Sequence, residues 1–234
     1  SLELQSLRVV SDLHLGGSAG FQIFGSTAEL AWLIKQVTLL PPPGPHALLI
    51  NGDFVDFLAE TPALPFDPAG AIAKFDDIWI RFAPVFQALQ RLVATPDRLL
   101  IINLGNHDLE LALPWVRTHL ARKLTNGDAA AHSRLLIVTD GTGLRCRVGN
   151  AVALCVHGNE VDAWNVIDYE RLRLTWERTR DIGVERDLDK LLQKILLSLF
   201  KFVKADRGVI LLKEADGSLQ PRAAHRRDGT DKPI

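Results

Sequence analysis

Three short polar strings constrain the fold of this chain more than any other feature. They are Asp12-Leu13-His14, Gly52-Asp53-Phe54-Val55-Asp56 and Gly105-Asn106-His107-Asp108. Each string follows an apolar run of the kind that forms a buried β-strand. Three such strings in this order indicate an α/β protein, in which strand ends deliver polar side chains to loops at one edge of a sheet.

The residue types in these strings are suited to binding metal ions. Asp12 and Asp53 offer carboxylates, Asn106 offers an amide oxygen and His14 offers an imidazole. Such a set of oxygen and nitrogen donors can bind two hard or borderline divalent cations. The short Asp12-x-His14 spacing lets two side chains leave one loop and converge on one ion.

These strings resemble those of the calcineurin-like metallophosphoesterase family. The resemblance covers about residues 7–170 and includes a fourth element, Val156-His157-Gly158-Asn159-Glu160, which follows the apolar run 151–156. It implies a layered α/β fold with one or more central β-sheets flanked by helices. It also implies an enzyme, namely a metal-dependent phosphoric ester hydrolase.

The resemblance further implies a set of metal ligands. In this reading Asp53 bridges two divalent metal ions. Asp12 and His14 hold the first ion, and Asn106 and His157 hold the second. Two adjacent metals acidify a water molecule and neutralise phosphoryl oxygens, so hydrolysis by attack of a metal-activated hydroxide is expected. Manganese is the first expectation for the metal, and iron, zinc or magnesium would suit the same donors.

His107 and Asp108 have a different implied role. The matching histidine of the family faces the substrate, which fits a general acid or a phosphate-binding group. Asp108 follows it as a candidate orienting carboxylate, and Asp56 is expected to hydrogen-bond a ligand histidine. The alternatives are a structural His107 and a His157 that is merely satisfied at a strand end.

One part of the family pattern is missing. The family normally closes with a Gly-His-x-His string, which supplies two further metal-ligating histidines. The only later histidine is His225, which has neither the glycine nor the paired imidazole. His46, His119 and His132 are expected at the surface. A site built only from this chain would therefore be short of ligands.

Apolar periodicity predicts the remaining elements of the first part of the chain. Residues 71–93 indicate an amphipathic helix, kinked or split near Pro84, whose aromatic residues pack in the core. Gly149-Asn150 is typical of a two-residue hairpin turn, which makes Cys146 and Cys155 diagonal neighbours that do not form a disulfide. Helices are also expected over 27–40 and from residue 114, and strands over 7–10, 47–50, 98–102, 134–138, 144–148 and 151–156.

The pattern changes after about Tyr169, and two domains are expected, a metallophosphoesterase domain (1–180) and a C-terminal extension (181–234). Residues 169–180 are charged and helical, and a second helix is expected from Asp187. Two strands then follow, over 208–212 and 219–224, around a turn. This helix-strand-turn-strand order resembles the opening third of a GAF sensor domain over about 50 residues. The alternative is an extension that packs on the phosphoesterase core.

Composition restricts the partners. The 234 residues include 27 basic and 28 acidic side chains, for a formal net charge of −1. This balance argues against non-specific binding of nucleic acid, which needs a dominant basic surface. No apolar run approaches the roughly 18–20 residues that span a bilayer. The first residues lack the features of a signal peptide, so a cytoplasmic location is expected.

Two functions remain open. The first is a binuclear metallophosphoesterase acting on a small phosphorylated substrate: a phosphomonoester, a phosphodiester or a pyrophosphate. The second is a non-catalytic or regulatory protein that keeps a partial metal site. It would signal through the GAF-like segment or by homodimerising through a helix over 188–202. The combination of Asn106, His107 and Asp108 favours the enzyme, whereas the missing Gly-His-x-His favours the regulatory protein. A metal-dependent nuclease is disfavoured by the net charge.

Overall fold

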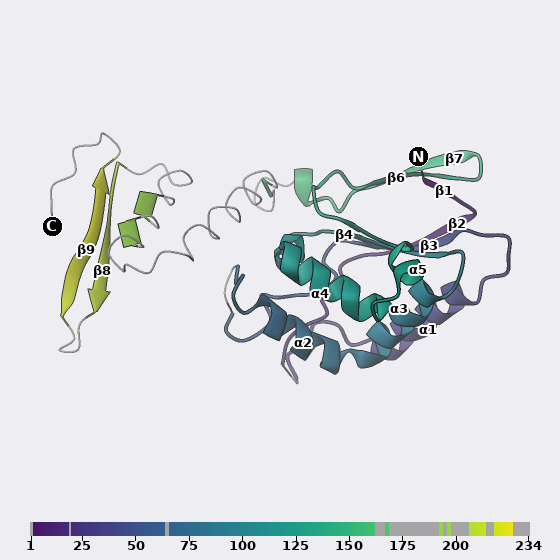
Figure 1. Cartoon of the computed structure of the whole chain (residues 1–234), viewed down its shortest axis with the longest axis horizontal. Coiled ribbons are helices and arrows are strands. Elements are labelled where there is room, and N and C mark those ends of the chain that lie inside the picture. Colours follow the sequence, from purple (N-terminus) through teal and green to yellow (C-terminus); the bar gives the residue numbers. More distant parts are fainter. Residues whose placement is uncertain are drawn as a thin grey trace. The chain divides into compact units, whose positions relative to one another are not determined.

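In the computed structural model of the chain, four parallel strands form the sheet that carries the three strings (Figure 1). All six residues of the second strand in this sheet are buried, as is typical of a parallel sheet covered on both faces. The strands lie in the order β2-β3-β4-β5, so the loops after β2, β3 and β4 meet at one edge. Their bounds are β2 (Ser6–Val10), β3 (His46–Asn51), β4 (Arg98–Asn103) and β5 (Leu135–Val138).

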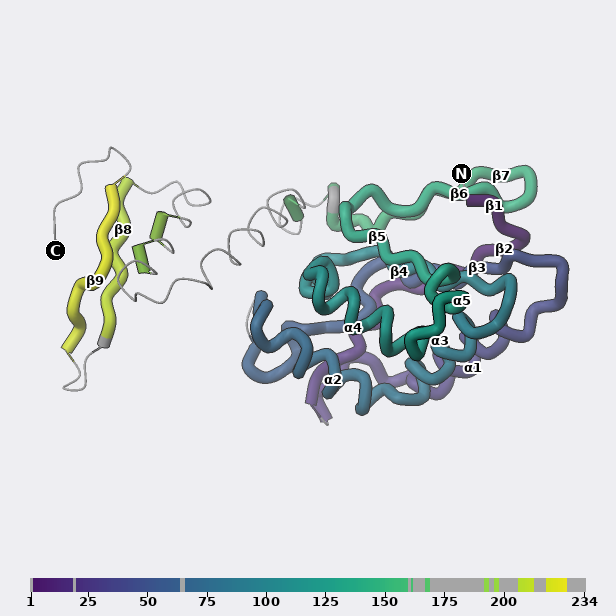
Figure 2. The backbone as a smooth tube through the Cα atoms, viewed as in Figure 1, coloured from purple at the N-terminus to yellow at the C-terminus, as the bar shows by residue number. Residues whose placement is uncertain are grey.

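A second, three-stranded sheet has the order β1-β6-β7. It consists of β1 (Leu2–Leu4), β6 (Leu144–Val148) and β7 (Ala151–Cys155). β6 and β7 form the predicted hairpin, in which Leu144 pairs with Cys155 and Cys146 with Ala153, and both cysteines are free. β1 was not predicted; it pairs with β6 in parallel, so the N-terminus lies beside the hairpin (Figure 2).

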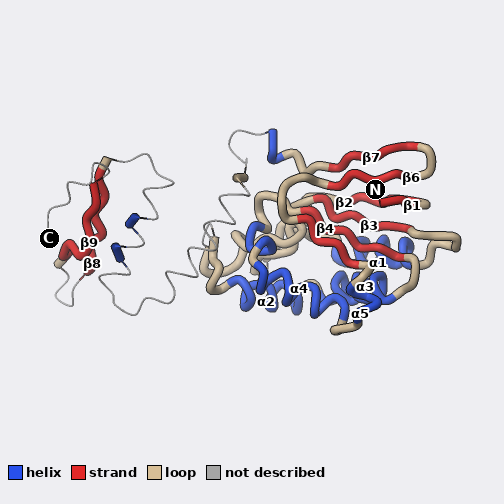
Figure 3. The backbone as a smooth tube through the Cα atoms, turned by 45° about the horizontal axis from the view of Figure 1, so that its top comes forward, coloured by secondary structure: helices blue, strands red, loops and turns tan. Residues whose placement is uncertain are grey.

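The two sheets pack against each other through alternate residues of the central strands. Ala47 and Leu49 of β3 contact Leu4, Leu144 and Cys146 of the second sheet in one buried cluster. Because successive side chains of a strand point to opposite faces, the neighbouring residues of β3 face the helices. Figure 3 shows the strands of both sheets on one side of the helices. The result is a layered α/β fold, as predicted from the sequence.

The helices cover the other face of the parallel sheet (Figure 1). The predicted helix over 71–93 is split at Phe82, and Pro84 lies at the start of the second piece, where its missing N–H costs no hydrogen bond. Phe75 and Phe86 from the two pieces are fully buried and pack edge to face, as expected for core residues. The helices are α1 (Thr27–Thr38), α2 (Ala71–Arg81), α3 (Ala83–Ala94), α4 (Pro114–Thr125) and α5 (Ala129–His132), with short 3-10 helices η1 (Leu109–Ala112) and η2 (Asn159–Val161).

The chain divides into two units, Ser1–Glu170 and Arg171–Ile234. The predicted boundary between residues 180 and 181 lies outside the described residues and stays a prediction. In the second unit, β8 (Arg207–Lys213) and β9 (Leu219–Arg226) form an antiparallel pair, as predicted. The predicted helix over 169–180 lies outside the described residues. The structure describes residues 2–18, 20–63, 66–161, 167–168, 192–193, 196–197, 206–213 and 218–226.

Candidate metal centre

The first two strings hold three residues in the left-handed backbone region. The φ angles are 55° at Asp12, 45° at His14 and 51° at Asp53. This conformation costs a non-glycine residue roughly 1 kcal/mol, and such strain gathers where the surrounding structure imposes it for function. Here the two strings hydrogen-bond to each other, from the His14 amide to the Asp53 carbonyl at 2.8 Å. The strained backbone thus lies where the two strings contact each other, at His14 and Asp53.

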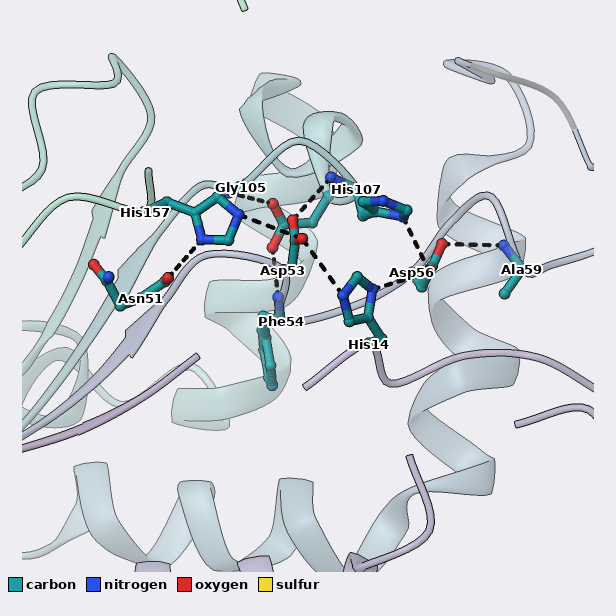
Figure 4. A network of polar contacts seen from close by, with 10 residues as sticks. His14, Asn51, Asp53, Phe54, Asp56, Ala59, Gly105, His107 and His157 are labelled. Carbon is teal, nitrogen blue, oxygen red and sulfur yellow. Dashed lines mark hydrogen bonds and ion pairs between the residues drawn. The ribbon is translucent and has the colours of Figure 1, made fainter. Parts of the chain in front are cut away.

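Asp53 lies at that point, with an imidazole on either side (Figure 4). Its Oδ2 atom is 3.3 Å from Nε2 of His157 and 3.5 Å from Nε2 of His14. Its Oδ1 atom accepts a hydrogen bond of 2.9 Å from the backbone N–H of His107. The Asp53 side chain is buried, so one carboxylate joins the loops after β2, β3, β4 and β7.

Asp53 and His157 stabilise each other's charged forms. Burial opposes the ionisation of Asp53, but the hydrogen bonds from His157 and from the His107 amide outweigh it and hold the pKa of Asp53 below its usual value. The hydrogen bond to Asp53 raises the pKa of His157 to about 9 against the effect of burial. A divalent cation would take the place of the proton on His157, because a metal binds the neutral ring.

His157 is oriented by a backbone group that sequence reasoning missed. Its Nδ1–H donates to the carbonyl oxygen of Asn51 at 2.9 Å, which leaves Nε2 facing Asp53. The Asn51 side chain is itself held, because it donates to the Val156 carbonyl at 2.8 Å and accepts from Asn103 at 2.7 Å. An asparagine that follows a run of apolar residues at the end of each of two strands was the available signal.

Asp56 orients two imidazoles at once. Its Oδ2 atom lies 3.1 Å from Nδ1 of His14 and 3.2 Å from Nδ1 of His107, and the two rings pack edge to face with centroids 4.7 Å apart. Its Oδ1 atom accepts from the Ala59 amide at 3.1 Å. Because a carboxylate can only accept, both rings donate through Nδ1, and Nε2 of His14 then faces Asp53. The expectation that Asp56 supports a ligand histidine agrees with this contact to His14.

Asp108 lies elsewhere than the sequence suggested. It was expected to orient His107, but Asp56 is the carboxylate that contacts that ring. The Asp108 side chain is fully buried, and its two oxygens accept from the amides of Gly105 at 2.7 Å and Phe54 at 2.8 Å. Burial, together with the charge of Asp53, raises the pKa of Asp108 to about 7. Asp108 therefore ties two loops together and is not placed to meet a substrate.

Two donor clusters share Asp53. In one, ligand atoms of His14, Asp53 and His107 lie within 4.8 Å of one another; in the other, those of Asp12, Asp53 and His157 do. Carboxylates and imidazoles converging in this way suit a divalent cation. Asp12 thus lies in the cluster that contains His157, and His14 lies in the cluster that contains His107.

The remaining candidates are placed as follows. Asn106 lies in the same loop as His107 and is partly buried. His46 was expected at the surface, but it is buried between the Ser6 hydroxyl at 2.7 Å and the Pro41 carbonyl at 2.9 Å. His119 hydrogen-bonds to Asp76 at 2.8 Å and does not reach the centre. Three histidines of the first unit therefore surround Asp53.

The fold and this site together define a layered α/β protein with a carboxylate–imidazole centre at a sheet edge, the arrangement expected of a metallophosphoesterase. The chain belongs to the calcineurin-like phosphoesterase family, whose model matches residues 6–215. Members of this family are metal-dependent hydrolases of phosphoric esters. No curated protein and no solved structure matches the chain.

The family match extends into the C-terminal part of the chain. It continues beyond residue 170, where the predicted resemblance ended, and includes all of β8. No match supports the predicted resemblance of the C-terminal extension to a GAF domain. No helix in the described ranges is long and apolar enough to cross a membrane.

Proposed function

We propose that this protein is a binuclear metallophosphoesterase that hydrolyses a small phosphomonoester, phosphodiester or pyrophosphate. The position of Asp53 carries the proposal, because its carboxylate belongs to both donor clusters. A carboxylate shared in this way is suited to bridging two cations. Asp12, His14, His157 and the Asn106 amide oxygen would supply the remaining ligands of the two ions.

His107 is proposed to handle a proton and not to bind metal. Its side chain is one-third exposed, at 33%, so a substrate can reach Nε2 while Asp56 holds Nδ1. This arrangement suits a general acid that protonates the departing oxygen of the ester. The bound cations would supply a strong nucleophile at neutral pH and neutralise charge on the phosphoryl oxygens.

Two substitutions test these roles separately. We expect Asp53→Asn to abolish hydrolysis of chromogenic phosphomonoesters and phosphodiesters with added Mn²⁺ and to release the metal. We expect His107→Ala to lower the rate by about 10²–10⁴-fold, the range for a lost general acid, while the metal stays bound. Asp97→Asn is the matched control, since Asp97 is also left-handed, with φ of 58°, but lies outside the centre. Equal loss of metal from both site variants would show that His107 is a ligand.

A regulatory protein is the second candidate, favoured by the missing Gly-His-x-His string. In that case the centre would bind metal without hydrolysing any ester. The small core of the second unit, in which Leu192 and Leu196 pack on Ala223 of β9, would then belong to a sensor or dimerisation segment. A folded protein that binds Mn²⁺ but is inactive on every ester class would favour this candidate over the enzyme.

A further inference from the structure

The first two strings remain paired beyond the ends of β2 and β3. The backbone of residues 12–15 continues alongside that of residues 52–56 as an irregular parallel ladder, which ends in an isolated bridge between Leu15 and Val55. Each metal-ligating residue of the first string is thereby fixed against the second string. The rungs run from Asp12 N to Gly52 O at 3.2 Å, His14 N to Asp53 O at 2.8 Å, Leu15 N to Phe54 O at 3.1 Å and Asp56 N to Leu15 O at 3.0 Å.

A side chain supplies the next rung of this ladder. The amide of Gly17 donates to Oε1 of Glu60 at 3.0 Å, in the place where a backbone carbonyl would otherwise accept. Gly17 has φ of 88°, so the first string turns away here and leaves the second. Glu60 is buried, with 6% of its surface exposed, and such a carboxylate needs a charged partner.

Arg81, the last residue of α2, is that partner. Its guanidinium binds the carboxylate in a bidentate manner, at 2.6 Å to Oε1 and 3.1 Å to Oε2 of Glu60. The same NH1 group donates to the carbonyl of Gly17 at 2.7 Å. The planar guanidinium fixes direction as well as distance. Both backbone groups of Gly17 are therefore bonded to one ion pair.

We propose that the Glu60–Arg81 ion pair is a positioning device for the metal centre. It anchors the first string three residues after His14 and the second string four residues after Asp56, and it fastens both to α2. A shift of Gly17 would pass along the ladder to His14, since only two residues separate them. This inference rests on the proposed function, because it treats His14 and Asp12 as ligands.

The same helix provides a matched control. Lys74 lies two turns before Arg81 on α2 and is also buried in an ion pair, with Asp67 at 3.1 Å. Its ammonium also donates to a backbone carbonyl, that of Pro62 at 2.7 Å. Lys74 thus resembles Arg81 in helix and bonding, although its side chain is more buried, at 4% exposed against 24% for Arg81. No hydrogen bond or ion pair joins Lys74 to the described residues of the loop that follows His14.

The experiment is a calorimetric titration of metal-free protein with Mn²⁺, accompanied by thermal unfolding followed by circular dichroism. Arg81→Met and Glu60→Ala are expected to weaken Mn²⁺ binding about tenfold, at the low end of the range for groups that orient metal ligands. Glu60→Gln should lose less, because its amide oxygen can still accept from Gly17. Lys74→Met should lower the melting temperature but leave the Mn²⁺ affinity unchanged.

The outcomes separate the inference from the function on which it rests. Equal Mn²⁺ affinity in folded Arg81→Met and Lys74→Met would overturn the positioning role. If Arg81→Met does not fold, Glu60→Ala decides in its place, and wild-type affinity in that variant would overturn the role as well. If the wild-type protein binds no Mn²⁺, the proposed metal centre is refuted instead. The same holds if the Asp53→Asn variant binds Mn²⁺ as tightly as the wild-type protein does.

Discussion

Replacing Asp56 by asparagine keeps the size of the side chain but removes the charge that holds two imidazoles. In the native protein Oδ2 faces Nδ1 of both His14 and His107, while Oδ1 accepts from the Ala59 amide. The amide oxygen of asparagine can keep the bond to Ala59. Its NH₂ group would then meet two ring nitrogens that also donate, and both rings would lose their orientation.

The size of the effect follows from the two contacts. A hydrogen bond to a charged group contributes about 1.5–3 kcal/mol, and Asp56→Asn weakens two of them. Loss of the group that orients a metal-ligating histidine typically weakens metal binding by about 10–100-fold, so we expect this loss through His14. A misplaced His107 should lower kcat by about 10²-fold even at saturating Mn²⁺, the low end for a lost general acid.

Asp108→Asn is the informative comparison, because Asp108 was the carboxylate expected beside His107. Its two oxygens accept hydrogen bonds from the backbone N–H groups of Gly105 and Phe54. In asparagine the NH₂ group would therefore face one of these N–H donors. We expect a loss of about 1–3 kcal/mol in the free energy of unfolding and little change in kcat of the folded enzyme. Urea unfolding and initial rates with saturating Mn²⁺ measure both quantities. Wild-type kcat in Asp56→Asn, with kcat lost in a stable Asp108→Asn, would refute this assignment.

Two further predictions concern the surroundings of the centre. In Gly105→Ala the new Cβ would overlap the backbone nitrogen and Oδ1 of Asp53, so we expect weaker Mn²⁺ binding and a loss of about 1–3 kcal/mol in stability. Gly25→Ala, with open space around its Cβ, is the control. Burial raises the pKa of Glu110 above its ordinary 4.5, so its ionisation opposes folding and stability should rise as the pH falls from neutral toward 4.5. Glu110→Gln should flatten that rise in urea unfolding, and an unchanged pH profile would contradict the reasoning.

The parts of the fold that depend on local pattern were predictable. The two-residue turn at Gly149-Asn150 fixes the register of its hairpin, so the pairing of Cys146 with Ala153 followed from the sequence. Proline at position 84 likewise located the break between α2 and α3. In both cases a single residue type restricts the backbone whatever surrounds it.

Features that depend on tertiary placement were not predictable. Adjacency to His107 suggested Asp108 as its partner, but a neighbouring side chain can point elsewhere, and the partner came from a string 51 positions earlier. His46 looked exposed because its partners, Ser6 and Pro41, come from other segments. β1 is only three residues long and gains its strand pairing from β6, so its own sequence carries little signal.

Strand β7 offers an edge to which another molecule can add a strand. It is an edge of its sheet in the described part of the chain, and its Val152 and Leu154 side chains are 52% and 68% exposed. Unpaired backbone groups beside apolar side chains invite pairing with another molecule. A strand added to this edge would run toward Val156 and His157, where β7 passes into the centre. Pairing of this kind would bring a second molecule close to the metal site, so an inactive preparation should be shown to be monodisperse before its inactivity is attributed to the chemistry.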